Sequence, residues 1–177
     1  MQTFLPYPSF KKSAEVLDTK RLYKQIVECK QILNVIRRKS AGEQKIGYAN
    51  HPIVIMWELF PLALRQYQIE CINEWLKRRY GLQMALFDDL EYPELDENPP
   101  DTPFWLGNER FHASHRSNLL RKFPEHYSQF GWKEPNDIPY YWFKDRKYPS
   151  EVENEDKEKW RESRDDIRRD SDERLTD

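Results

Sequence analysis

The sequence predicts an all-α protein, with a compact single-domain fold of about three long helices, irregular aromatic segments and a charged C-terminal helix or tail. Three observations predict this class. Apolar residues recur at helical spacing over long stretches, whereas the alternation typical of strands is scarce. The 177 residues include only five glycines and no Asn-Gly hairpin signal. The hydrophobic content of 38% is sufficient for one domain with a core.

Two helices are expected in the first forty residues. The first starts near Ser9, and the second runs from a cap at Asp18 to about Arg38. Apolar residues of the second helix recur at steps of three and four, which predicts one buried stripe: Leu22, Ile26, Cys29, Leu33 and Ile36. A polar stripe lies beside it: Arg21, Lys24 or Gln25, Glu28 and Gln31.

A long central helix is expected over residues 52–80. Pro52 suits its first turn and Gly81 can follow its end. Pro61 falls inside the pattern, which predicts a kink or a break at that point.

A third helix is expected after the Pro- and acid-rich loop of residues 86–104. Asn108 is its predicted N-cap, and it should end before Pro124. Residues 131–143 combine aromatic side chains with prolines, which predicts an irregular segment packed on the helices.

Charge divides the chain into a helical domain, residues 1–149, and a charged tail, residues 150–177. The tail carries 12 acidic and seven basic residues, so residues 1–149 carry a net charge of +3 although the whole chain carries −2. A basic body with acidic appendages is compatible with a nucleic-acid partner, although a solvated mixed surface would have the same composition. If the tail competes with DNA, its deletion after Lys147 should tighten DNA binding.

The expected location is a reducing cytoplasm. Cys29 and Cys71 lie on apolar helix faces, which favours core thiols over a disulfide. The N-terminus lacks the apolar region of a signal peptide, and no apolar run approaches the ~20 residues of a membrane span, so no membrane partner is expected.

Glu28 is a single carboxylate among cations. It lies one helical turn from Lys24 and two turns from Arg21. One interpretation is a surface ion pair of little energetic value. The other is an acid/base group in a groove whose cations attract phosphates.

A second group of polar residues lies in "HASHRSNLLRK". His112, His115 and Arg116 share a helix face, and Asn118, Arg121 and Lys122 follow, which are residue types typical of phosphate contacts. The alternatives are ordinary helix-face histidines or a metal site. In a metal site, His51 or His126 could join His112 and His115.

His51 precedes the central helix, and either caps it or reaches a ligand there. The histidine pair lacks the usual metal-site context, so no metal is expected. The chain also has no Gly-rich phosphate loop, no Ser-His-Asp arrangement and no C-x-x-C, which disfavours nucleotide hydrolysis, serine hydrolysis and thiol redox chemistry. No cofactor is expected.

Several stretches resemble the pyrimidine-dimer DNA glycosylase (endonuclease V) family, particularly its uncharacterised bacterial and phage members. They are "MQTFLPYPSFKKSAEVLDTKRLYKQIVECKQIL", "HPIVIMWELF", "QIECINEWLKRRYG" and "HASHRSNLLRKFPEHY", and the resemblance covers roughly residues 1–143. It implies a compact helical enzyme that bends duplex DNA and flips a nucleotide. It also implies an N-terminal α-amino group that attacks the sugar C1′ to form a Schiff base, with help from a glutamate, before β-elimination cuts the strand.

The resemblance places the family's glutamate on Glu28. The amine is that of Met1, because the bulky Gln2 normally leaves Met1 in place, whereas the characterised enzyme exposes a small polar residue after Met removal. Lys24 is an alternative amine. The family's helix histidine falls on Arg21, and two of its DNA-contacting arginines fall on Val27 and Gln31, so Arg21, Lys24 and Lys30 would have to compensate.

The sequence thus predicts a DNA glycosylase/AP lyase-like enzyme for damaged or modified bases in duplex DNA. The alternatives are a non-catalytic DNA- or nucleotide-binding protein, and an enzyme for a modified base or free nucleotide with His112, His115 and Glu28 lining its pocket. The predicted nucleic-acid contacts are Arg21, Gln25, Lys30, Gln31, His51, His112, His115, Arg116, Asn118, Arg121 and Lys122.

Overall fold

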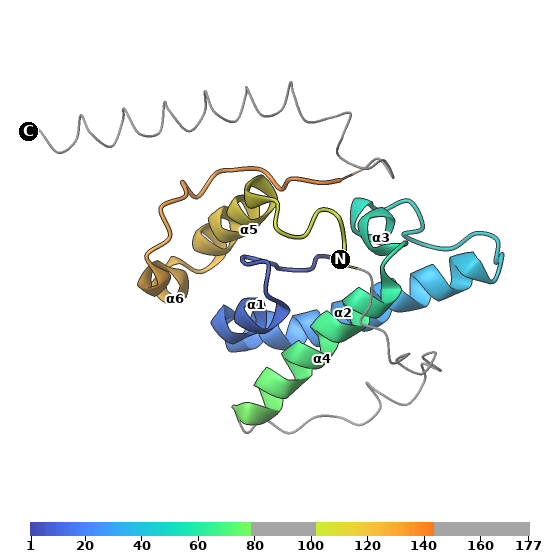
Figure 1. Ribbon diagram of the computed structural model, residues 1–177, viewed down its shortest axis with the longest axis horizontal. Coiled ribbons are helices and arrows are strands. Elements are labelled where there is room, and N and C mark those ends of the chain that lie inside the picture. Colours follow the sequence, from blue (N-terminus) through green and yellow to red (C-terminus); the bar gives the residue numbers. More distant parts are fainter. Residues whose placement is uncertain (79–101, 144–177) are drawn as a thin grey trace, which may run out of the picture. The chain divides into compact units, whose positions relative to one another are not determined.

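The structure, a computed structural model, describes residues 1–78 and 102–143. Its elements in chain order are α1 (Phe10–Val16), α2 (Thr19–Ser40), α3 (Pro52–Trp57), α4 (Pro61–Lys77), α5 (Glu109–Lys122), α6 (Pro124–Tyr127) and the short 3₁₀ helix η2 (Ser128–Phe130) (Figure 1). No strand occurs within these two ranges, so the all-α prediction is confirmed.

The predicted helix starts are confirmed by their caps. The Ser9 side chain accepts a hydrogen bond from the Lys12 N–H at the start of α1, and Asp18 caps α2 in the same way. The Asn108 side chain accepts from the Phe111 N–H at the start of α5. Each cap satisfies a backbone donor that has no partner within its helix, which is why these helices begin where they do.

The break predicted at Pro61 is present, because the central helical region is interrupted at residues 58–60, which separate α3 from α4. Pro61 causes the break. Its nitrogen has no hydrogen to donate to the Trp57 carbonyl, and its ring would clash with that carbonyl in a continuous helix. The Phe60 N–H bonds to the Trp57 oxygen instead, at 2.8 Å, which closes a turn.

The core lies where α2 packs against α3 and α4, and where α1 packs against α4. All five residues of the predicted α2 stripe are buried. Cys29 and Cys71 are buried and free, as predicted. Trp57 is fully buried and meets Trp105 edge to face, with ring centroids 4.8 Å apart, an arrangement that aromatic quadrupoles favour.

Residues 131–143 form an irregular segment after η2, as predicted. This segment covers one side of α5. The Ser117 hydroxyl bonds to the Pro135 carbonyl and accepts from the Ile138 N–H, and the Tyr141 N–H donates to Ser114 Oγ at 3.2 Å. The N-terminal segment covers another side, so residues 111–119 of α5 are all buried.

Three predictions fall outside the described residues. They concern the helix end at Gly81, most of the acid-rich loop of residues 86–104, and the charged tail of residues 150–177. Within the described ranges, no helix is both long and apolar enough to span a membrane.

Candidate active site

Residues 2–6 are held in place by side chains of the surrounding helices. Gln25 of α2 accepts a hydrogen bond of 2.7 Å from the Phe4 N–H and donates one of 3.1 Å to the Gln2 carbonyl. Tyr67 of α4 donates to the Phe4 carbonyl at 2.7 Å, and Trp57 donates to the Thr3 hydroxyl at 3.1 Å. Backbone groups that leave water need such partners, so these contacts allow the segment to be buried.

Helix α5 holds the next part of the segment. His115 Nδ1 accepts from the Leu5 N–H at 3.3 Å, and His112 Nδ1 contacts the Leu5 carbonyl at 2.7 Å. Arg116 donates to the Pro6 carbonyl at 2.9 Å. The segment is therefore fixed from both sides, which determines where the first residue lies.

This segment brings the N-terminus to Glu28. The Gln2 N–H donates to Glu28 Oε2 at 2.5 Å, and Lys24 Nζ lies 3.4 Å from Oε1. The α-amino nitrogen of Met1 is three covalent bonds from the Gln2 nitrogen, about 4.3 Å of bond length, so it lies within about 7 Å of Oε2. Lys24 thus contacts the carboxylate directly, and the α-amino group of Met1 lies in its neighbourhood.

The two amines lie in different surroundings. The Lys24 side chain is 63% exposed, whereas that of Glu28 is 9% exposed. The carboxylate is thus largely shielded from water, and both of its oxygens face a donor. A charge in such a place interacts more strongly with its neighbours than a fully hydrated one does.

His51 faces the same site. Its Nδ1 accepts from the Ile53 N–H at 3.2 Å and so caps α3, which leaves the proton of the neutral ring on Nε2. Burial lowers the pKa of His51, and the positive α-amino group of Met1 lowers it further, while the charge of Glu28 opposes the shift. The ring therefore lies within electrostatic reach of both groups.

Four cations gather where α2 meets the C-terminal end of α5: Arg21, Lys24, Arg121 and Lys122, here called the cationic cluster. Partial burial and the charges of Arg121, Arg21 and Lys24 lower the pKa of Lys122. Arg21 is fixed by Asp18 at 2.7 Å and by the Lys122 carbonyl at 3.2 Å. Because these like charges repel, an anion bound among them would relieve the repulsion.

Two aromatic residues of the 131–143 segment also face this site, and the sequence analysis did not single them out. Burial raises the pKa of Tyr140 to about 12, against the opposing charges of Arg121 and Arg21, while the Glu28 charge adds to the rise. The Trp142 ring meets the His51 ring edge to face at 6.1 Å. The available signal was the aromatic content of the segment, but that content does not say which helix it covers.

Five predicted DNA contacts lie inside the protein: Gln25, His112, His115, Arg116 and Asn118. Beyond the bonds above, Arg116 pairs with Glu109 and with Glu134, and Asn118 donates to the carbonyls of Ser114 and Ile138. These side chains are engaged within the fold. They are therefore excluded from the DNA-contacting surface proposed below.

The remaining predicted residues lie on α2. Gln31 is exposed one turn beyond Glu28, on the same side of the helix. Lys30 is two residues from Glu28, a spacing that points the two side chains away from each other. Only Gln31 of this pair can extend the face that carries Lys24 and Glu28.

The histidines do not gather as a metal site. His112 receives a hydrogen bond of 3.0 Å from the Gly107 N–H at Nε2, so its Nδ1 carries the proton and donates to Leu5. His126 Nε2 lies 3.0 Å from the Val16 carbonyl. In the part of the chain that the structure describes, no three potential ligand side chains form a group able to hold a metal ion.

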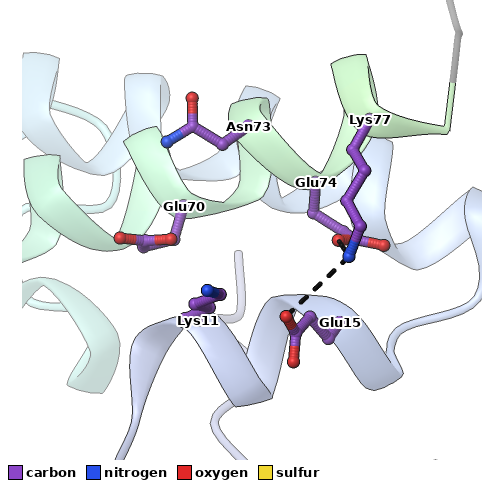
Figure 2. Close-up of a pocket in the computed structure, with 6 residues that line it drawn as sticks. All are labelled: Lys11, Glu15, Glu70, Asn73, Glu74 and Lys77. Carbon is purple, nitrogen blue, oxygen red and sulfur yellow. Dashed lines mark hydrogen bonds and ion pairs between the residues drawn. The ribbon is translucent and has the colours of Figure 1, made fainter.

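A separate cavity of about 450 Å³ lies between α1 and α4. Figure 2 shows the six residues that line it: Lys11, Glu15, Glu70, Asn73, Glu74 and Lys77. Lys77 Nζ lies 4.0 Å from a carboxylate oxygen of Glu15 across the cavity. None of the predicted site residues lines it. Its three carboxylates make it unsuited to a phosphate-bearing ligand.

These features define a class of protein. The protein is helical, and it brings a shielded carboxylate, an amine and four cations together at its N-terminus. Such a site suits a polyanionic substrate that is attacked by an amine.

Comparison with known families agrees with this class. The family model described as pyrimidine dimer DNA glycosylase matches residues 1–88, which include α1 to α4 and Glu28. The resemblance is therefore confirmed for this part of the chain, and the match supports a DNA glycosylase-like role in general, with DNA as the substrate that the family implies. Searches of curated proteins and of solved structures found no match.

Proposed function

We propose that the protein is a DNA glycosylase with AP lyase activity that acts on damaged or modified bases in duplex DNA. Pyrimidine dimers are the first substrate to test. The observation that carries the proposal is the hydrogen bond from the Gln2 N–H to Glu28, because it holds the start of the chain beside a shielded carboxylate. The family match supports DNA as the substrate. The cationic cluster supplies charges for the phosphates.

The proposed reaction starts with a neutral α-amino group at Met1. The reference pKa of an α-amino group is lower than that of a lysine side chain, so a larger fraction of α-amino groups is neutral near pH 7. The nitrogen attacks C1′ of the target nucleotide. The bond from C1′ to the base breaks, and the base leaves with a proton. Ring opening then moves electrons from nitrogen to C1′ and a proton to O4′, which gives a Schiff base.

Glu28 has two roles in this scheme. Its negative charge stabilises the positive charge that develops on the Schiff-base nitrogen, and its carboxylate accepts protons released along the way. Loss of a proton from C2′ then breaks the bond from C3′ to the 3′ phosphate oxygen. The leaving phosphate carries negative charge, which Arg21, Arg121 and Lys122 can stabilise.

Lys24 is the alternative nucleophile, since its Nζ lies 3.4 Å from Glu28 Oε1. The experiment that separates the two amines is borohydride trapping on a duplex with one thymine dimer, followed by digestion and mass spectrometry. The expected adduct is on the N-terminal peptide. An adduct on the peptide that contains Lys24 would identify Lys24 as the nucleophile.

Variants test the chemistry as a whole. Glu28→Gln keeps the size of the side chain and a hydrogen-bond acceptor, and should lower trapping at least 100-fold. Lys24→Arg keeps the positive charge but removes a nucleophilic amine. This variant should retain most of the trapping activity. If the wild-type protein forms no adduct with dimer, abasic-site or modified-base duplexes, the proposal fails.

A non-catalytic DNA-binding protein is the second candidate. One observation favours it: both Glu28 oxygens already face donors within the protein, the Gln2 N–H and Lys24. It predicts binding that weakens steeply with salt, with no trapped adduct on any substrate. Salt-independent binding would count against this candidate.

A further inference from the structure

Arg21 of the cationic cluster is held by three parts of the fold. Its Nη1 donates to Asp18 Oδ2 at 2.7 Å, just before the start of α2. Its Nη2 donates to the Lys122 carbonyl at 3.2 Å, at the end of α5. Its guanidinium carbon lies 5.8 Å from the centre of the Tyr127 ring in α6, within the range of a cation–π contact. These three contacts fix the direction in which the guanidinium points.

Asp18 is itself fixed by Tyr127. Its Oδ1 accepts from the Arg21 N–H at 3.2 Å and caps α2. Its Oδ2, which also pairs with the Arg21 side chain, accepts from the Tyr127 hydroxyl at 2.6 Å, and the Asp18 N–H donates to the same hydroxyl at 3.2 Å. Asp18 and Tyr127 are both buried. The position of the acceptor for Arg21 therefore depends on Tyr127.

These hydrogen bonds keep Asp18 ionised inside the protein. Burial alone would raise the pKa of Asp18, but the hydrogen bonds from Tyr127 and Arg21 outweigh burial, so the pKa is lowered. A largely buried ion pair contributes little net stability, because the cost of desolvation offsets the attraction. The Asp18–Arg21 pair is therefore better explained by the orientation it gives to Arg21 than by the stability of the fold.

Part of the Arg21 guanidinium is available to a ligand. A guanidinium has five N–H donors, and within residues 1–78 and 102–143 the two bonds above use two of them. The side chain is 17% exposed. Arg21 also precedes Glu28 by seven residues, which is two turns, or about 10.5 Å, along the same face of α2. A phosphate beside the target nucleotide can therefore meet the remaining donors while the sugar faces Glu28.

We infer that Asp18 and Tyr127 are positioning residues, which hold the Arg21 guanidinium in the orientation that binds a phosphate next to the target nucleotide. The inference rests on the proposed function, in which Arg21 stabilises the leaving phosphate. An arginine whose orientation is set in advance loses less conformational entropy when it meets its ligand. A carboxylate that only offset the charge of Arg21 would have the opposite effect, because it would weaken DNA binding.

Asp18→Asn tests the inference through this difference in sign. An amide has one acceptor oxygen where a carboxylate has two, so asparagine can still cap α2 but then presents an NH₂ donor to the Arg21 side chain. Positioning predicts weaker binding, with a slope of log K against log salt that is smaller by about one, as in Arg21→Gln. Fluorescence anisotropy on a duplex with a stable abasic-site analogue measures both. Tighter binding with the wild-type slope would show that Asp18 only offsets charge, and would overturn the inference.

A double-mutant cycle shows whether Asp18 acts through Arg21. Arg21→Gln removes the charge but keeps an N–H donor for Asp18. In this background, Asp18→Asn should not weaken binding further. An equal loss in both backgrounds would assign Asp18 an ordinary structural role and overturn the inference. Glu125→Gln, which removes an exposed carboxylate from α6, is the matched control for the lost charge and should keep the wild-type slope.

Tyr127→Phe is the second variant. It changes no charge and keeps the ring beside Arg21, but it removes the hydroxyl that fixes Asp18. It should weaken binding in the wild-type background and have less effect in the Arg21→Gln background. Urea denaturation identifies the temperature at which each variant is folded, and binding is compared there. A folded Tyr127→Phe protein that binds as wild type would remove Tyr127 from the inference.

These binding measurements need no catalysis, so they separate the inference from the proposed function. If no substrate gives an adduct but the slopes change as described, the lyase assignment fails and the positioning of Arg21 stands. If the wild-type protein gives an adduct but Asp18→Asn keeps the slope, positioning alone fails. With both correct, Asp18→Asn should lower trapping roughly 10-fold, about the size of one lost hydrogen bond to a charged group.

Discussion

The backbone nitrogen of Gln2 lies 2.5 Å from Oε2 of Glu28. The nitrogen closest to the carboxylate thus belongs to residue 2, and the α-amino group of Met1 lies one residue before it in the chain. The contact uses the main chain, so it does not depend on the glutamine side chain. The position of the proposed nucleophile relative to Glu28 therefore depends on which residue comes first.

Gln2→Ser should increase trapping on an abasic-site duplex. A small second residue favours removal of Met1, which converts the nitrogen beside Glu28 into the α-amino group itself. Mass spectrometry of the intact protein checks the removal, and borohydride trapping checks the rate. Gln2→Leu, which should retain Met1, is the control. Complete removal of Met1 with an unchanged or lower rate would contradict this account.

Gln25→Leu should destabilise the fold by about 2–5 kcal/mol, because a buried polar group left without a partner costs about 1–3 kcal/mol. The substitution keeps a similar volume but leaves the Phe4 N–H and the Gln2 carbonyl unpaired, and removes an acceptor from Tyr67. Urea denaturation measures the change. Gln31→Leu, on the exposed side of the same helix, should change the free energy of unfolding by less than about 0.5 kcal/mol.

Stability should fall as the pH drops from about 6.5 towards 3, because of His115. Burial, and then the nearby His112 and Arg116, lower the pKa of His115 to about 3. The unfolded chain takes up this proton near pH 6.5 and the folded protein does not, so acid favours unfolding throughout that interval. The contribution is on the order of a few kcal/mol and is complete above the unfolded-state pKa.

His115→Asn tests this account. Its side-chain oxygen can replace Nδ1 as the acceptor for the Leu5 N–H, and it does not titrate in this range. Urea denaturation at a series of pH values should give a flatter profile for the variant. Identical profiles for the two proteins would show that other groups cause the acid sensitivity.

Arg121→Ala and Lys122→Ala should each weaken DNA binding and reduce the slope of log K against log salt by about one. Removing a cation removes one phosphate contact and its released counterion. Fluorescence anisotropy over a range of salt concentrations gives the slope. Lys12→Ala, an exposed cation of α1, should leave the slope unchanged. Equal slopes for all proteins would remove the cationic cluster from the interface.

The local structure could be predicted from the sequence because its causes are local. Asp18 and Asn108 cap helices through hydrogen bonds to residues three positions later, and the break at Pro61 follows from one missing N–H. The burial of the α2 stripe follows from its spacing. The same reasoning located Glu28, because a carboxylate among cations on one helix face is visible in the spacing.

The partners of the polar residues could not be predicted in this way. Gln25 and Glu28 share a polar stripe in the sequence, but the N-terminal segment covers Gln25 and uses both ends of its amide. In the sequence, His112, His115 and Arg116 have the pattern of a phosphate-binding face. In the structure, the N-terminal segment covers them. The contacts join residues more than one hundred positions apart, and helical spacing carries no information at that range.

Helix α5 has a consequence for how the protein can be divided. The family match ends at residue 88, before this helix begins, yet His115, His112 and Arg116 provide the partners for Leu5 and Pro6. A fragment cut at the end of the match would expose these main-chain groups and lose the supports that hold the start of the chain. We therefore expect a fragment that folds by itself to include α5 as well as the matched residues.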